Sequence, residues 1–200
     1  MNKNFEYRNE GEIGILEDSR TVVGYASVFG VRSNPLMGKL NGKDILFTET
    51  IEAGAFDGLI DKSDVVACFN HETDNGILAR SKNGVGTLQL EIDERGLKYT
   101  FELPNTAQGD MLLESLKRGD IDSSSFAFIV LQGGETWTRE SDGIYSRSIS
   151  KIGKLVDIAI VVRPAYNEAS VNLRGLESTL EIEQQEELES YFTELTNLIK

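Results

Sequence analysis

The chain contains a single histidine, His71, and this limits the acid–base chemistry that the protein can perform. His71 closes the run "VVACFNH" at 65–71. Strand alternation predicts that Val65, Ala67 and Phe69 share its face. If the protein uses an imidazole as general base near neutral pH, that base must be His71. A lone histidine is more often structural or simply exposed, so a catalytic assignment depends on finding its partners.

Three consecutive serines at 123–125 run directly into the apolar strand pattern "FAFIV". Alternation places the two phenylalanines on one face and Ser125 with Ala127 on the other. Small neighbours leave room for a substrate above Ser125, which suits a nucleophile. Serines that merely close a turn after "RGDID" are an equally good explanation of the local sequence. A strand shifted by one residue would present Ser124 in place of Ser125.

A carboxylate stands inside the apolar strand pattern "LVDIAIVV" at 155–162. Asp157 and Ala159 share a face opposite Ile158 and Ile160. A carboxylate is costly to bury in such a strand unless it is paired or hydrogen-bonded. An imidazole N–H is a suitable partner, because the carboxylate then fixes the tautomer whose other nitrogen accepts a serine proton. An arginine, a lysine or water at a sheet edge would serve the carboxylate equally well.

The composition argues against several classes of partner and site. With 200 residues, of which 40% are hydrophobic, the chain can bury the core of one domain. The formal net charge of -13, without a basic cluster, argues against nucleic acid as a partner. One cysteine, Cys68, forms no internal disulfide, and with one histidine it leaves thiolate and imidazole zinc sites essentially unavailable. We therefore expect no cofactor and no metal.

No segment of the sequence predicts export or insertion into a membrane. Residues 1–20 are polar and lack the continuous apolar core of a signal peptide. No later stretch approaches the roughly 18–20 apolar residues that cross a bilayer. We expect a cytoplasmic protein without a membrane partner.

Short runs rich in β-branched and aromatic residues recur along the chain, separated by Gly, Asn and Asp, which predicts a mainly β (α+β) domain. The triplet "ERG" at 94–96 predicts a hairpin turn. A short helix is predicted near residues 52–60. The predicted strands are 21–30, 65–70, 85–93, 97–104, 125–132, 135–140, 144–152 and 154–162.

Two longer helices are predicted. The first begins near Asn105, which resembles a capping box with Gln108, and ends at the stop signal "KRG". The second lies within 177–200, where apolar residues follow helical spacing and seven glutamates stand against one lysine. One interpretation of this acidic amphipathic tail is a solvated helix with a single apolar face that packs on another surface. The alternative is a segment that binds a surrounding shell of partner proteins or is itself cleaved off.

Five short motifs stand in a fixed order along the chain: "GYASVFG" at 24–30, "ETIEAGAFDGLI" at 49–60, "ACFNHE" at 67–72, "RGDIDSSSFAF" at 118–128 and "LVDIAIVVRPAYNEASV" at 155–171. Together they resemble the prohead protease family of tailed bacteriophages. One motif alone, such as "GAF" or "PAY", would be weak, but five with compatible spacing are specific. The resemblance covers roughly residues 20–172, and the chain divides accordingly into a polar segment at 1–20, a protease domain at 21–172, and a linker with the acidic helical tail at 173–200.

The resemblance implies a serine endopeptidase that matures viral capsids. Such an enzyme acts in the host cytoplasm, inside the procapsid, where it cleaves scaffolding segments of the major capsid protein and then itself. Its expected partners are the major capsid protein with its scaffolding segment, and also the portal or further copies of the same chain. The family is related in fold to herpesvirus assembly proteases, which implies a closed or nearly closed β-barrel surrounded by a few helices.

The resemblance also assigns roles to residues. Ser125, which precedes the "FxF" pattern, corresponds to the nucleophile, and His71 to the general base. Asp157 stands where the family carries an acid, although a glutamate is at least as usual there. Herpesvirus relatives use a second histidine as the third member, and this chain has none. Arg163 and Arg80 are further candidates for side chains that stabilise the negative oxygen of the tetrahedral intermediate electrostatically.

The sequence departs from the family at two positions and leaves other functions open. Ser124 replaces a larger apolar residue before the nucleophile, and Ala127 replaces a glycine between the phenylalanines. A noncatalytic capsid-assembly or scaffolding module is the main alternative function. A third alternative is a β-rich binding domain whose serines, histidine and aspartate never meet. A protease requires His71 within hydrogen-bond reach of Ser125, with Asp157 behind it.

Overall fold

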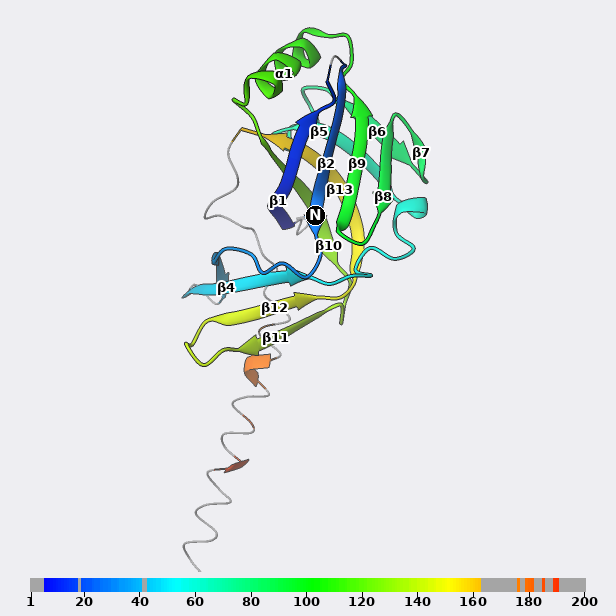
Figure 1. Cartoon of the computed structure of the whole chain (residues 1–200). Helices are drawn as coiled ribbons and strands as arrows, with labels where there is room; N and C mark the ends of the chain where they lie inside the picture. The colour runs from blue at the N-terminus through cyan, green and yellow to red at the C-terminus, as the bar shows by residue number, and fades with distance from the viewer. Residues whose placement is uncertain are drawn as a thin grey trace, which may run out of the picture.

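The computed structural model describes residues 6–17, 19–40 and 43–162, together with 176, 179–181, 185 and 189–190. Its strands form two sheets, and Figure 1 shows the smaller sheet below the larger one, with helix α1 (Ala107–Arg118) at the opposite end. The expectation of a mainly β fold with few helices is confirmed for these residues.

The larger sheet has nine strands, and Ser125 and Asp157 lie on neighbouring strands near its centre. β13 (Ile152–Val161) lies between β5 (Asp64–Phe69), to which it is parallel, and β10 (Ser123–Val130), to which it is antiparallel. The order across the sheet is β7 (Val85–Gly86), β6 (Ala79–Lys82), β5 (Asp64–Phe69), β13 (Ile152–Val161), β10 (Ser123–Val130), β1 (Glu6–Ile15), β2 (Thr21–Val28), β9 (Gly96–Glu102) and β8 (Leu88–Ile92).

The larger sheet is strongly curved, so that β6 and β8 approach each other although they stand near opposite ends of the strand order. No hydrogen-bonded ladder joins these two strands in the described part of the chain. The expected closed barrel is therefore not seen there.

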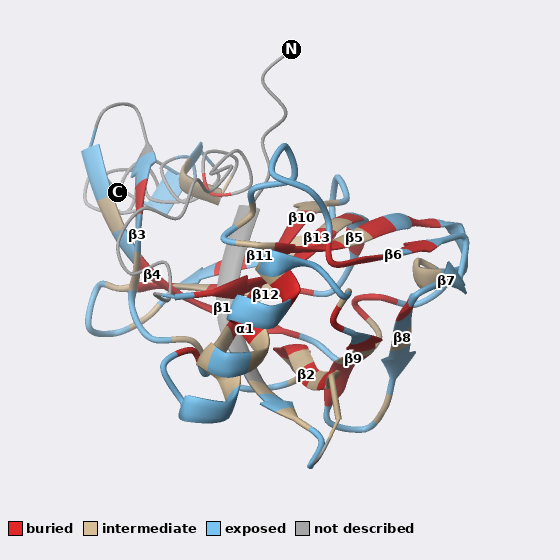
Figure 2. Ribbon diagram, turned by 90° about the horizontal axis from the view of Figure 1, so that it is seen from above, coloured by how far each residue is buried: buried red, intermediate tan, exposed pale blue. Residues whose placement is uncertain are grey.

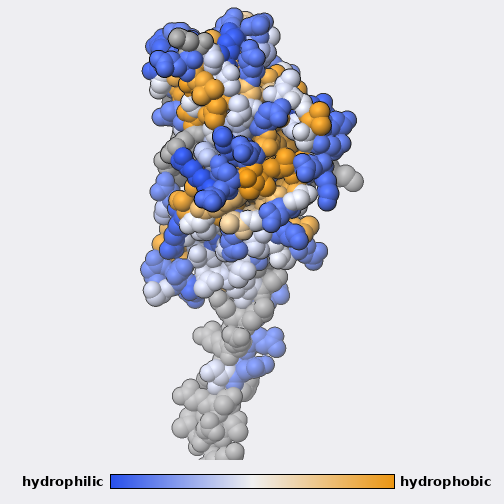
Figure 3. Space-filling view, turned by 45° about the vertical axis from the view of Figure 1, so that its right-hand side comes forward, coloured by the Kyte–Doolittle hydropathy of each residue, from blue (hydrophilic) through white to orange (hydrophobic). Residues whose placement is uncertain are grey.

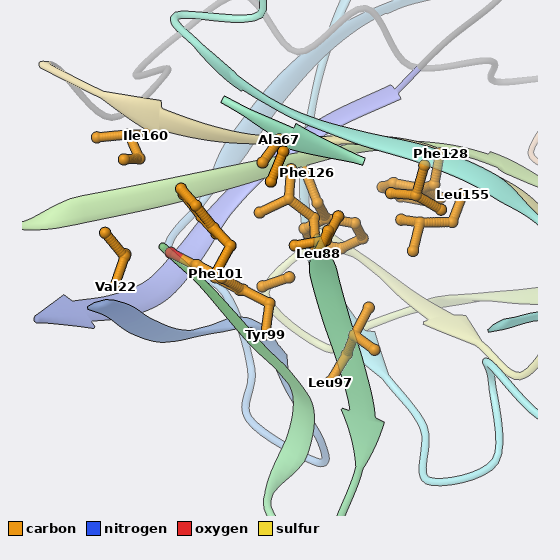
Figure 4. Packing of buried hydrophobic residues seen from close by; sticks show 14 of the residues in the cluster. Val22, Ala67, Leu88, Leu97, Tyr99, Phe101, Phe126, Phe128, Leu155 and Ile160 are labelled. Atoms are coloured by element: carbon orange, nitrogen blue, oxygen red, sulfur yellow. The ribbon is translucent and has the colours of Figure 1, made fainter. Parts of the chain in front are cut away.

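The main core lies inside this curve. Phe126 and Phe128 of β10 are completely buried and stack with ring centroids 4.9 Å apart. Figure 4 shows them among apolar side chains of β2, β5, β8, β9 and β13 that point into the same interior. Buried residues dominate β10, β13 and β5 in Figure 2. Several apolar side chains around this core are only partly buried, and apolar patches interrupt the hydrophilic surface in Figure 3.

The smaller sheet has the order β11 (Glu135–Arg139), β12 (Tyr145–Ile149), β4 (Lys43–Ile51) and β3 (Leu36–Leu40). Its largest fully buried side chain is Arg147. Arg147 Nη1 donates to Glu49 Oε2 at 2.8 Å, and its guanidinium also pairs with Glu135. The buried cation is thus matched by carboxylates from both neighbouring strands.

A second apolar cluster covers the same face of the smaller sheet. Phe47, Trp137 and Tyr145 pack there with Leu176, which is fully buried, and with Leu180. The described residues of the predicted tail helix are all helical, and Leu176 and Leu180 have the i, i+4 spacing of one helix face. The remainder of that predicted helix lies outside the described residues.

Helix α1 leads into β10 and is capped at both ends. The predicted capping box at Asn105 is wrong, because Thr106 is the N-cap and its side chain accepts a hydrogen bond from the Gly109 N–H. The predicted stop is confirmed: Gly119 adopts a left-handed conformation with φ 74° and donates to Leu116 O. Only the short connection 120–122 separates this cap from the start of β10.

Each predicted strand is present, with shifted ends, and the hairpin at 94–96 joins β8 to β9. Strands β1, β3, β4 and β6 were not predicted. The predicted helix near 52–60 is wrong: turns occupy 53–59 and a single 3-10 turn, η1, spans Ile60–Lys62. Gly54 and Gly58 have φ values of 88° and 66°, which an α-helix cannot contain.

Among the described residues, no helix is both long enough and apolar enough to cross a membrane.

We expect Glu49→Ala to lower the free energy of unfolding by about 3–5 kcal/mol, because it leaves the buried Arg147 cation short of a partner. Urea titration measures this loss as a lower midpoint with an unchanged slope. The matched control is Glu91→Ala, which removes an exposed partner of Lys98 and is expected to cost less than about 1 kcal/mol. Equal effects of the two substitutions would contradict this account.

Candidate active site

Ser125 and Asp157 lie on one face of the larger sheet because of the register between β10 and β13. Ser125 pairs with Ala159, and Ala127 pairs with Asp157. Residues that pair across antiparallel strands point to the same side, as do residues two apart on one strand. The serine and the carboxylate are therefore diagonal neighbours on the face opposite the phenylalanine core.

His71 reaches the same face because the chain leaves the extended conformation after β5. Asn70 and His71 have φ values of 50° and 61°, so two consecutive non-glycine residues are left-handed. The Asn70 N–H donates to Ile160 O at 2.9 Å, and Asn70 Oδ1 accepts from the Val162 N–H at 3.2 Å. These bonds tie the turn to the end of β13.

This turn overturns one prediction of strand alternation. Val65 and Ala67 belong to the main core, together with Phe126. His71 instead contacts Ser125 and Asp157 on the opposite face. Alternation holds only while the backbone stays extended, and the left-handed pair reverses the side to which His71 points.

The three side chains form a continuous hydrogen-bonded chain. His71 Nδ1 lies 2.6 Å from Asp157 Oδ1, and His71 Nε2 lies 2.7 Å from Ser125 Oγ. An ionised carboxylate can only accept, so Nδ1 carries the hydrogen and donates it to Asp157. In the neutral ring, Nε2 is then an acceptor for the Ser125 hydroxyl. This arrangement can transfer a proton from Ser125 to His71 while Asp157 stabilises the resulting imidazolium.

Burial strengthens these interactions. Ser125 is 1% exposed, the Asp157 side chain is 7% exposed and the His71 side chain is 18% exposed. Charges and dipoles act more strongly where water is excluded. The expectation of open space above Ser125 and Ala127 is wrong, since both are buried and the His71 ring lies against the hydroxyl.

Cys68 was not predicted to belong to this site, yet it lies beside the histidine and the aspartate. It pairs with Ala159 across β5 and β13 and is fully buried. Its Sγ lies within 4.8 Å of a carboxylate oxygen of Asp157 and of a ring nitrogen of His71. Burial, and then the Asp157 charge, raise the pKa of the thiol to about 12. Cys68 is therefore a neutral thiol near neutral pH and a poor nucleophile.

The other two serines point away from His71 or bond elsewhere. Ser124 is completely buried, and its Oγ donates to Tyr25 O at 3.1 Å. The Ser123 hydroxyl donates to Asp122 at 2.7 Å. Both residues belong to β10, so the alternative in which the serines close a turn is wrong. The hydrogen bonds therefore identify Ser125, and not Ser124, as the serine that contacts His71.

Arg80, one of the two arginines considered as candidates for electrostatic stabilisation, is bonded elsewhere. The Arg80 guanidinium is exposed and binds Asp64 with two nitrogens, one of them at 2.7 Å. This pairing raises the pKa of Arg80 and lowers the pKa of Asp64, chiefly through the hydrogen bond. Arg163 lies outside the described residues.

Comparison with known proteins identifies one family. The sequence model for the caudovirus prohead serine proteases matches residues 4–184, a span that includes Ser125, His71 and Asp157. No curated protein and no solved structure matches the chain.

The short bond between His71 Nδ1 and Asp157 predicts a proton resonance far downfield of ordinary imidazole N–H signals in the NMR spectrum. The assignment is unambiguous because the chain has one histidine. We expect Asp157→Asn to abolish this resonance, since an amide is a weaker acceptor than a carboxylate. Asp64→Asn, at the exposed pair with Arg80, is the matched control and should retain it. A resonance that survives Asp157→Asn would show that the bond is absent in solution.

Proposed function

The chain belongs to the caudovirus prohead serine protease family, and on this basis we propose that it is a serine endopeptidase of capsid maturation with Ser125 as nucleophile. The observation that supports this assignment is the hydrogen-bonded chain from Ser125 Oγ through the His71 ring to Asp157. A scaffolding or binding module has no need for a buried serine, histidine and carboxylate in this order.

The first half of the proposed reaction forms an acyl-enzyme. His71 Nε2 removes the Ser125 proton as Oγ attacks the carbonyl carbon of the peptide bond. The imidazolium that results is stabilised by the Asp157 carboxylate at Nδ1, and Nε2–H then protonates the departing amine. In the second half, the same nitrogen takes a proton from water, which attacks the ester and releases the acid. Ser125 regains its hydrogen from His71 at the end of the cycle.

Asp157 contributes orientation as well as charge. A 2.6 Å bond to Nδ1 fixes both the tautomer and the plane of the ring, so that Nε2 faces Ser125 before any substrate arrives. The left-handed turn at Asn70 and His71 holds the ring from the backbone side. This preorganisation avoids a rearrangement during the reaction.

The proposed substrates are the scaffolding segment of the major capsid protein and the protease itself. Family membership places the chain among proteins of the viral procapsid. We propose that it acts inside the procapsid, in the host cytoplasm, where a high local concentration of coat subunits supplies substrate. Cleavage of its own chain would end the activity once maturation is complete.

The nucleophile can be tested by expressing the chain together with the major capsid protein and following fragments by intact mass. We expect wild type to cleave the coat protein and itself, and Ser125→Ala to leave both chains whole. Ser124→Ala is the matched control, because its hydroxyl only bonds Tyr25 O and its loss should leave the fragments unchanged. Fragments from Ser125→Ala identical to those of wild type would exclude Ser125 as nucleophile.

Asp157→Asn should lower kcat by roughly 10³–10⁴-fold with little change in KM, because an amide favours the wrong tautomer of His71. Steady-state hydrolysis of a peptide that spans a mapped cleavage site measures both constants. Asp64→Asn serves as the control for removal of a carboxylate from a neighbouring strand and is expected to behave as wild type. A decrease of less than tenfold for Asp157→Asn would show that the acid has no orienting role.

A further inference from the structure

Three different metal-binding atoms meet beside Ser125. Cys68 Sγ, an imidazole nitrogen of His71 and a carboxylate oxygen of Asp157 all lie within 4.8 Å of one another. Cys68 and Asp157 come from the paired strands β5 and β13, and His71 follows the end of β5. The backbone therefore fixes the positions of all three ligands, and Cys68 and Asp157 are almost fully buried.

The donor set and its dimensions suit a small thiophilic cation. Zn²⁺ binds thiolate, imidazole and carboxylate at about 2.0–2.3 Å in tetrahedral geometry, which separates neighbouring ligand atoms by roughly 3.4–3.6 Å. His71 Nδ1 and Asp157 Oδ1 are 2.6 Å apart. To bind the metal, the carboxylate oxygen must therefore move slightly away from Nδ1, and the Cys68 sulfur must move toward both atoms. Ca²⁺ and Mg²⁺ prefer sites made of oxygen ligands only, and one thiolate with one imidazole selects against them.

We propose that Cys68, His71 and Asp157 form a reversible inhibitory site for a thiophilic divalent cation of the Zn²⁺ class. The thiol of Cys68 loses its proton to solvent and His71 binds the metal through Nδ1. The two charges of the cation are then balanced by one thiolate and one carboxylate. A site that is neutral overall can be buried where an unbalanced charge could not.

The bound cation is incompatible with the catalytic cycle, and this part of the inference rests on the proposed function. Coordination at Nδ1 leaves the single hydrogen of the neutral ring on Nε2. Nε2–H is a donor and cannot take the proton of Ser125. The metal also occupies the carboxylate that would stabilise the imidazolium. Metal binding and general-base catalysis therefore use the same ring in two exclusive tautomers.

Binding is tested first in the full-length Ser125→Ala chain, which is proposed to be unable to digest itself and retains all three ligands. We expect Co²⁺ to produce a thiolate-to-metal charge-transfer band, and Zn²⁺ to displace it with release of one proton per ion by calorimetry in two buffers. The chain has one cysteine and one histidine, so both signals report this site alone. Absence of the band at saturating Co²⁺, with Zn²⁺ also failing to bind, would overturn the proposal.

Ligand variants of the same chain identify the atoms that bind. Cys68→Ala must lose the charge-transfer band, and Asp157→Asn must weaken Co²⁺ binding. Asp64→Asn removes a carboxylate from the start of β5 and must bind as the parent does. Circular dichroism establishes that each variant is folded. Metal binding that is unchanged in a folded Cys68→Ala chain would contradict the assignment of the sulfur ligand.

Inhibition is tested in the wild-type chain with the peptide substrate. Zn²⁺ at the concentration that saturates the Ser125→Ala chain should abolish hydrolysis, and EDTA should restore it fully, in wild type and in Asp64→Asn alike. Full activity with the metal bound would overturn the inhibitory role. A wild-type chain that hydrolyses nothing even in EDTA would refute the proposed protease function, while the binding measurements would still decide the metal site.

Discussion

The antiparallel register of β10 on β13 is the constraint on which the rest of the site depends. It pairs Ser125 with Ala159 and Ala127 with Asp157, so that the hydroxyl and the carboxylate emerge on one face at a distance that a single imidazole can bridge. The parallel pairing of β5 with β13 then delivers His71 to the end of that face. A slip of one residue would turn Ser124 outward and would move the carboxylate's partner to the other side of the sheet.

Apolar packing on the far side of β10 sets this register more strongly than the polar contacts do. Burial of Phe126 and Phe128 contributes about 1.5–3 kcal/mol for each side chain, whereas a hydrogen bond contributes about 1 kcal/mol net. The left-handed Asn70 and His71 cost about 1–3 kcal/mol each. Two hydrogen bonds between Asn70 and the end of β13 offset part of that cost, and the packed sheet supplies the remainder. The core face of β10 therefore determines the geometry of the opposite face.

Sequence reasoning succeeded where the backbone is regular and failed where it is not. Alternation placed Ser125 with Ala127 on one face of their strand and Asp157 with Ala159 on one face of theirs, and the structure confirms both because β10 and β13 are extended there. The same rule failed at His71, since no periodicity predicts two left-handed residues in succession. Strand β4 was missed because Glu49 interrupts its apolar face, and only the structure reveals that Arg147 allows this carboxylate to be buried. The position of Cys68 beside His71 and Asp157 could not be predicted, because it depends on the parallel pairing of β5 with β13, which are far apart in the sequence.

Burial of Asp157 links the stability of the fold to the chemistry of the site. An unpaired carboxylate that is 5% exposed would cost several kcal/mol. The His71 ring donates to Asp157 at 2.6 Å, and this bond is also the one that leaves Nε2 free to accept the Ser125 proton. The contact that permits the acid to stay in an apolar strand is thus the same contact that selects the reactive tautomer. A cation bound at Nδ1 would also stabilise the buried carboxylate, but it would select the opposite tautomer, so folding tolerates both states while catalysis requires the metal-free one.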